Sequence, residues 1–184
     1  QGALKWLLVC CFGYLGYRNA RFGRIEAHEA TCAFSREILL QAREICESRG
    51  YEVIHGIVDC VWIRRVKSHP GNIRKLCLDI NEATGLHIAA EGRYRWIVFL
   101  PSRTDPGRPV PNRYFGCFQG GRLKYRGIEI RRGDCAPYVQ HLQGELLEAL
   151  REAYSLEECR ALRSRLVEIV RQSELHLGLG EVDL

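Results

Sequence analysis

The feature of this sequence that most constrains its fold is a pair of β-rich apolar runs between Val53 and Ile63. The two runs meet at a glycine turn around Gly56, which predicts a β-hairpin with Asp59 at its tip. An ionised carboxylate on an apolar hairpin is costly to bury unless a cation or hydrogen bonds balance it. Asp59 is therefore either a turn residue in water or a ligand for a cation.

The segments around this hairpin predict an α+β fold. Residues 3–11 look like the end of a helix, and a loop rich in glycine and tyrosine follows over residues 12–24. Helices are expected from about Ile25 to Arg49, between Pro70 and Gly85, from near Pro137, and after a capping box at Ser155. Strands are expected at 86–90, 93–100, 113–118 and 123–130, with a loop at 104–111 and a hairpin turn at 119–121. The expected architecture is an antiparallel sheet with flanking helices, followed by a helical C-terminal portion.

The charge distribution favours a polyanionic partner. The net charge is +5, and residues 93–132 hold ten lysines and arginines but only Asp105 and Glu129 as acids. A locally basic segment in a mildly basic protein suits a polyanion better than a membrane. A solvated face with scattered arginines remains the alternative. The longest apolar runs, such as Leu7 to Cys11, are too short to span a bilayer.

The nine cysteines form no CxxC pair and match no zinc-binding spacing. Most lie in apolar runs, where cysteine behaves as a small buried hydrophobe. Their odd number and the lack of a signal peptide predict reduced thiols in a cytoplasmic protein. Because methionine is absent, we expect a chain that was processed or cut from a longer one.

Three ordered stretches together resemble a family B DNA polymerase. The segment from Lys5 to Tyr14 resembles the family's Kx3NSxYG motif, and the segment from His55 to Cys60 resembles its Y-x-D-T-D-S turn. Arg113-Tyr114 and residues 126–134 resemble the family's KKRY and RGLExxRRD segments, and residues 17–24 resemble a divergent subgroup from archaea and some bacteria. The resemblance implies the end of the fingers and a loop over 1–24, a palm over 25–135 and the start of a helical thumb over 136–184.

The resemblance also implies roles for individual residues in template-directed nucleotidyl transfer. Asp59 aligns with the second aspartate of the turn and would be a catalytic ligand of a two-Mg²⁺ site. Glu91 would be an accessory metal ligand, or else a strand-end carboxylate in solvent. Lys5 would contact the triphosphate of the incoming dNTP, and Phe12 and Gly13 would pack under the nascent base pair. The residues expected to contact primer-template DNA are Arg113, Tyr114, Lys124, Arg126, Arg131 and Arg132.

Several positions depart from the family's pattern. Ile57 and Val58 replace the first aspartate and the threonine of the turn, and Val9-Cys10 replaces the Asn-Ser pair. Pro111-Asn112 replaces two lysines, which weakens the expected grip on duplex DNA. In the family, the other catalytic aspartate lies in a segment N-terminal to the fingers. We therefore expect the C-terminal part, or a small subunit, of a nucleoid-associated polymerase that is inactive without a larger N-terminal partner.

A second hypothesis belongs to another class of function. The chain could be a catalytically inactivated polymerase-like module that binds duplex DNA or acts as a scaffold. The changes at Ile57 and Val58 favour this alternative, whereas the retained Asp59, Lys5 and Gly13 oppose it. A generic basic RNA-binding domain is disfavoured because the aromatic platforms of such modules are missing.

Overall fold

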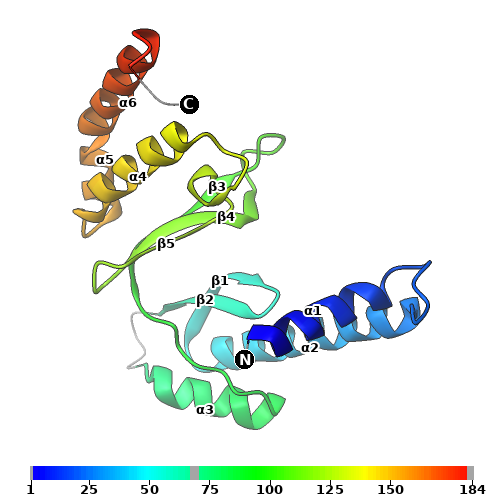
Figure 1. The fold of residues 1–184 in the computed structure, drawn as a ribbon. Helices are drawn as coiled ribbons and strands as arrows, with labels where there is room; N and C mark the ends of the chain where they lie inside the picture. The colour runs from blue at the N-terminus through cyan, green and yellow to red at the C-terminus, as the bar shows by residue number, and fades with distance from the viewer. Residues whose placement is uncertain (1, 67–70, 182–184) are drawn as a thin grey trace. The chain divides into compact units, whose positions relative to one another are not determined.

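A computed structural model describes residues 2–66 and 71–181 of the chain (Figure 1). The chain divides into two compact units, Gln1–Ala90 and Glu91–Leu184, and each is described by itself. Helices flank two small antiparallel sheets, which confirms the predicted α+β class. The predicted domain boundaries at residues 24 and 135 stay predictions.

Over residues 2–66 and 71–90, the first unit contains three helices and one β-hairpin. The helices are α1 (Gly2–Leu15), α2 (Ile25–Ser48) and α3 (Ile73–Thr84), and the hairpin consists of β1 (Tyr51–Ile57) and β2 (Cys60–Arg65). α1 continues beyond the expected end at residue 11, so the connecting loop covers only residues 16–24. α3 begins with Asn72, whose side chain accepts a hydrogen bond from the Lys75 N–H at 3.1 Å, and Gly85 closes it at φ 69°. The predicted helix start at Pro70 lies outside the described residues.

The hairpin forms as predicted, but its turn was placed wrongly. The two-residue turn consists of Val58 and Asp59, and Gly56 lies inside β1 opposite Val61. A Cβ on Gly56 would lie 3.7 Å from Leu39 of α2, an ordinary contact distance. Gly56 is therefore an ordinary strand position, and the chain reverses after it, at Val58 and Asp59.

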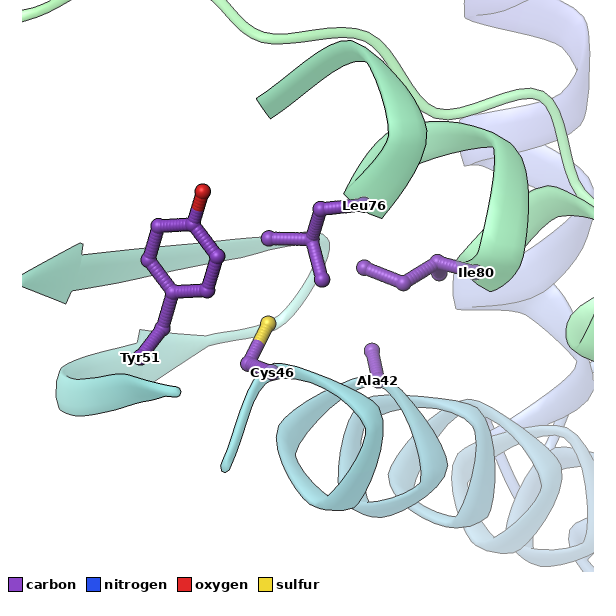
Figure 2. Close-up of a cluster of buried hydrophobic side chains, with 5 residues drawn as sticks. All are labelled: Ala42, Cys46, Tyr51, Leu76 and Ile80. Atoms are coloured by element: carbon purple, nitrogen blue, oxygen red, sulfur yellow. The ribbon is translucent and has the colours of Figure 1, made fainter. Parts of the chain in front are cut away.

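The core of the first unit joins α2, α3 and β1. Its buried side chains come from Ala42 and Cys46 of α2, Tyr51 of β1, and Leu76 and Ile80 of α3 (Figure 2). Burial raises the pKa of Cys46 to about 11, so this thiol stays protonated at neutral pH. All nine cysteines are free thiols.

The second unit combines a three-stranded sheet with helices. The strands are β3 (Tyr94–Pro101), β4 (Pro109–Phe118) and β5 (Leu123–Arg126), paired in that order and all antiparallel. A short 3₁₀ helix, η1 (Glu129–Arg131), precedes α4 (Pro137–Arg151), α5 (Leu156–Ala161) and α6 (Arg163–Gly178). Within the described residues, no helix has both the length and the apolar character needed to cross a membrane.

Three strand predictions needed correction. Residues 86–90 form no strand, because the Ile88 N–H donates to the Asn81 side chain at 2.6 Å instead of to a neighbouring strand. β5 ends at Arg126 because Gly127, at φ 64°, turns the chain away from the sheet. β4 begins at Pro109, inside the segment that was expected to be a loop, and pairs there with Pro101.

A buried hydrogen bond ties the sheet of the second unit to the segment after α4. The Trp96 indole N–H donates to the Ala153 carbonyl at 3.0 Å, and both residues are buried. The Ser155 hydroxyl then caps α5 by accepting the Glu158 N–H at 3.2 Å. The Glu158 carboxylate accepts from the Tyr154 N–H, one residue before the position that a capping box uses.

Candidate functional site

Asp59 lies at the tip of the β1–β2 hairpin, with its side chain exposed. The Cα-paired residues Ile57 and Cys60 close the turn, and the Cys60 thiol donates to the Ile57 carbonyl at 3.5 Å. Among residues 2–66 and 71–181, the Asp59 carboxylate has no hydrogen-bond or ion-pair partner. The hairpin thus presents an uncommitted carboxylate, the hard oxygen ligand that Mg²⁺ prefers.

The backbone next to this carboxylate is strained. Val58 has φ 46°, and it is the only non-glycine residue with a positive φ in the described part of the chain. A β-branched residue is a genuine outlier in the left-handed region. Such strain clusters at sites where a fixed geometry matters. The strain at Val58 sets the direction in which the chain leaves β1 and therefore where Asp59 emerges.

The residues present do not by themselves complete a metal site. No group of three or more His, Cys, Asp or Glu side chains that could hold a metal ion occurs among the described residues. A pair of divalent ions bound by oxygen needs several ligands. Asp59 can supply one of them, so a two-magnesium centre would need carboxylates from another segment or chain.

The predicted nucleotide-binding residues Lys5, Phe12 and Gly13 all lie on α1. This helix is apolar around its whole circumference and contains no buried residue. Lys5 is exposed, and a Cβ on Gly13 would have no neighbour within 4 Å. Lys5 and Phe12 are seven residues apart, so they share one helix face about 10 Å apart along the axis. Their nucleotide-binding roles stay predictions.

Glu91, predicted near the metal ions, and Lys124, predicted at the duplex, form an ion pair with each other. The Glu91 carboxylate forms a close ion pair with the Lys124 ammonium, and Arg122 approaches it at 3.9 Å. Lys124 is only about a quarter exposed. Glu91 neutralises Lys124, so either predicted role requires this ion pair to open.

The remaining residues predicted to contact the duplex differ in burial and in whether they already form ion pairs. Tyr114 is only 2% exposed and packs against Phe99, with 5.7 Å between the ring centroids, so it belongs to the core. Arg132 is held by Asp134 through two bonds of 2.9 and 2.6 Å. Arg126 and Arg131 are exposed and form no ion pair within the described residues. Of the predicted duplex contacts, Arg126 and Arg131 are the two whose guanidinium groups form no ion pair among the described residues and can meet phosphates.

Arg113 belongs to a network that joins three elements of the second unit. Its guanidinium donates to the Gly127 carbonyl at 2.8 Å and pairs with Glu129 at 3.1 Å. The Gln143 side chain of α4 donates to Glu129 at 2.7 Å and accepts from the Ile130 N–H at 2.8 Å. The bond from Gln143, a backbone hydrogen bond and the charge of Arg113 lower the pKa of Glu129.

Comparison with known proteins shows what this chain is similar to. No family model matches it. It is 39% identical over 163 residues to DNA polymerase 2 of Saccharolobus solfataricus, an alignment that covers 89% of this chain and 24% of the relative. It is 28% identical over 184 residues to DNA polymerase 2 of Aeropyrum pernix, and 25% identical over 177 residues to a DNA polymerase of Archaeoglobus fulgidus. These two alignments cover 100% and 96% of this chain, and 21% and 22% of the relatives.

The chain is homologous to a portion of archaeal family B DNA polymerases. It spans about a quarter of the length of the curated relatives it matches. This finding confirms the family resemblance that the three motifs predicted. The roles of the individual site residues stay predictions.

Two structurally important residues in this DNA polymerase homologue were missed from the sequence. His28 of α2 stacks on Phe12, and Gln143 of α4 binds Glu129. Both contacts join segments that are 14 or more residues apart. In the sequence, His28 and Gln143 look like ordinary polar residues of amphipathic helices, and many other positions have the same appearance.

Proposed function

We propose that this chain supplies part of the active site and part of the DNA-binding surface of a template-directed DNA polymerase. Other polymerase regions, in the same protein or in a partner chain, would supply the second catalytic aspartate. The observation that carries the proposal is the alignment of 89–100% of the chain with archaeal DNA polymerases. The free carboxylate of Asp59 at the tip of a strained hairpin supports it.

Each group of residues would have one task. Asp59 would hold a metal ion, and the exposed Lys5 would place a positive charge on the triphosphate of the incoming dNTP. Phe12 and Gly13 would pack under the new base pair. Arg126 and Arg131 would bind phosphates of the primer-template duplex without reading its sequence.

Mg²⁺, once bound, would stabilise the charge that develops at the transferred phosphate. One carboxylate is too few for two such ions, so we propose that this chain alone does not extend a primer. Asp59 would act only when carboxylates from another segment or chain complete the site.

Primer extension tests the proposal directly. This chain would replace the matching segment of the Saccharolobus solfataricus enzyme, and the chimera would be assayed with Mg²⁺, dNTPs and primer-template DNA. Asp59→Ala should abolish extension, with a loss of at least about a hundredfold, whereas Ile57→Ala should retain it. Extension that is unchanged in Asp59→Ala would exclude the proposed role of this carboxylate.

A second candidate function is a catalytically inactivated module that binds duplex DNA. The observation that favours it is that Ile57 and Val58 leave Asp59 without a second carboxylate in the turn. This candidate predicts duplex binding that is weakened by an Arg126→Ala, Arg131→Ala double variant, together with no extension in the chimera. Extension by the chimera would exclude it.

A further inference from the structure

The C-terminal end of α1 is held in place by one histidine of α2. α1 and α2 lie side by side in the first unit (Figure 1). The His28 Nδ1 lies 3.1 Å from the Phe12 carbonyl oxygen. Because a carbonyl oxygen only accepts hydrogen bonds, Nδ1 carries the proton and donates it.

This hydrogen bond satisfies the Phe12 carbonyl, an acceptor near the C-terminal end of α1. The last four carbonyls of a helix have no intrahelical partner, and Phe12 is the first residue of that last turn. The Tyr14 and Leu15 carbonyls accept from the backbone N–H groups of Tyr17 and Arg24, at 3.1 and 3.0 Å. His28 is thus the side-chain cap of α1.

The imidazole also stacks on the aromatic ring of the same residue. The centroids of the His28 and Phe12 rings are 4.2 Å apart, with 26° between their planes. Phe12 is 38% exposed, so part of its ring remains open. His28 therefore holds both the backbone and the side chain of Phe12.

Gly16 makes room for this arrangement. A Cβ on Gly16 would lie 3.0 Å from the Nδ1 and Cε1 atoms of His28, tighter than nine in ten real contacts of this kind. Lys5 and Phe12 are seven residues apart on one face of α1, and Gly16 follows directly after the end of the helix. The imidazole thereby fixes the rotation of α1 about its own axis.

We propose that His28 is a positioning residue, which sets the orientation of Phe12 and Lys5 toward the incoming nucleotide. This inference rests on the proposed function, because it takes Phe12 and Lys5 as the nucleotide-binding residues. His28 does not touch the nucleotide; it acts through the Phe12 carbonyl and ring. The residue matters because α1 buries no side chain of its own, so few other contacts restrain its rotation.

Hydrogen exchange on the purified chain tests the positioning without requiring activity. His28→Ala should speed amide exchange in residues 12–24 by about tenfold, since it removes one hydrogen bond and one ring stack. His28→Phe keeps a ring and His28→Gln keeps a donor, so each should fall between the wild type and His28→Ala. His141→Ala in α4 is the control and should leave this segment unchanged. Unchanged exchange in His28→Ala would overturn the proposal.

A double-mutant cycle with Gly16 checks that the ring itself is responsible. Gly16→Ala should speed exchange in the wild type, because the added methyl group displaces the imidazole. The same substitution in the His28→Ala background should have almost no further effect. Additive effects of the two substitutions would mean that Gly16 and His28 act independently, which contradicts the proposed geometry.

Steady-state kinetics of the chimera separate positioning from simple stabilisation. His28→Ala should raise the KM for dNTP by about tenfold and change kcat by less than about threefold. Faster exchange with an unchanged KM would make His28 a purely structural residue and overturn the inference. If the chimera with the wild-type segment extends no primer, the proposed function is overturned, and with it the claim that His28 orients the nucleotide-binding residues. The hydrogen-exchange measurement would still report whether His28 holds the end of α1.

Discussion

The Arg113 guanidinium lies 3.1 Å from the Glu129 carboxylate and also donates to the Gly127 carbonyl. A residue that the motif resemblance predicts to contact the DNA duplex is thus a structural tie between β4 and the segment that leads to α4. Gln143 extends the tie to α4 itself. Any loss of DNA binding in an Arg113 variant must therefore be separated from a loss of fold.

The tie through Glu129 should depend on pH. The pKa of Glu129 is lowered by hydrogen bonds from Gln143 and the backbone and by the nearby Arg113, from an ordinary value of 4.5. A lowered native pKa contributes stability above the unfolded value, and this stability is lost as the pH falls through the native pKa. Glu129→Gln should therefore destabilise the protein by about 1 kcal/mol at pH 7.

Urea unfolding at pH 7 and at pH 3 measures this difference. The gap between the wild type and Glu129→Gln should begin to shrink as the pH falls below about 4.5, the ordinary value, and should close as the pH falls through the lowered native pKa of Glu129, because both proteins then carry a neutral group. Glu37→Gln, at an exposed site of α2, is the control and should show no such change. A gap of equal size at both pH values would contradict the assigned ion pair.

Gly127 should tolerate no side chain. It has φ 64°, and a Cβ would lie 2.2 Å from the Asn112 carbonyl oxygen, a backbone atom that cannot move aside easily. Gly127→Ala should cost more than about 2 kcal/mol. Gly133→Ala, where a Cβ would meet nothing within 4 Å, is the matched control and should be nearly neutral. Thermal unfolding of the two variants against the wild type gives the comparison.

The strain at Val58 predicts a stabilising substitution. Val58→Gly removes the steric cost of φ 46° but increases the conformational entropy of the unfolded chain. We expect the free energy of unfolding to rise by about 0.5–1 kcal/mol. Val61→Gly, inside β2 and opposite Gly56, should instead destabilise the hairpin by more than about 1 kcal/mol. Urea titrations followed by circular dichroism check both signs. Destabilisation by Val58→Gly would show that the contacts of the valine side chain stabilise the fold more than the strained backbone angle at this residue destabilises it.

The buried bond between Trp96 and Ala153 should be important for the second unit. Trp96→Phe leaves the Ala153 carbonyl without its partner inside the core, which should cost about 1–3 kcal/mol. Trp6→Phe is the control, because Trp6 is 71% exposed on α1 and should change stability by less than about 0.5 kcal/mol. Equal unfolding midpoints for the two variants would mean that the bond to Ala153 contributes nothing.

The helices and the hairpin were predictable because their signals are local. Apolar residues at helical spacing, Pro137 at the start of α4 and Gly85 at the end of α3 are visible within a few positions of one another. The three motifs that resemble family B DNA polymerases are equally local, and the homology to archaeal polymerases confirms what they predicted. The errors occurred where side chains compete with strand pairing, as at residues 86–90, where a strand was expected but the Thr84 and Asn81 side chains accept the Leu86 and Ile88 N–H groups.

The amino-acid order alone therefore determined the α+β class, the position of the Asp59 hairpin and the polymerase ancestry. Tertiary structure decided which predicted residues are free to act. It buries Tyr114, pairs Glu91 with Lys124, and leaves Asp59 and Arg126 uncommitted. It also brings His28 onto Phe12, 16 residues away. The reason is physical: periodicity and turn chemistry act over a few residues, whereas ion pairs, ring stacks and burial depend on which distant segments the folded chain brings into contact.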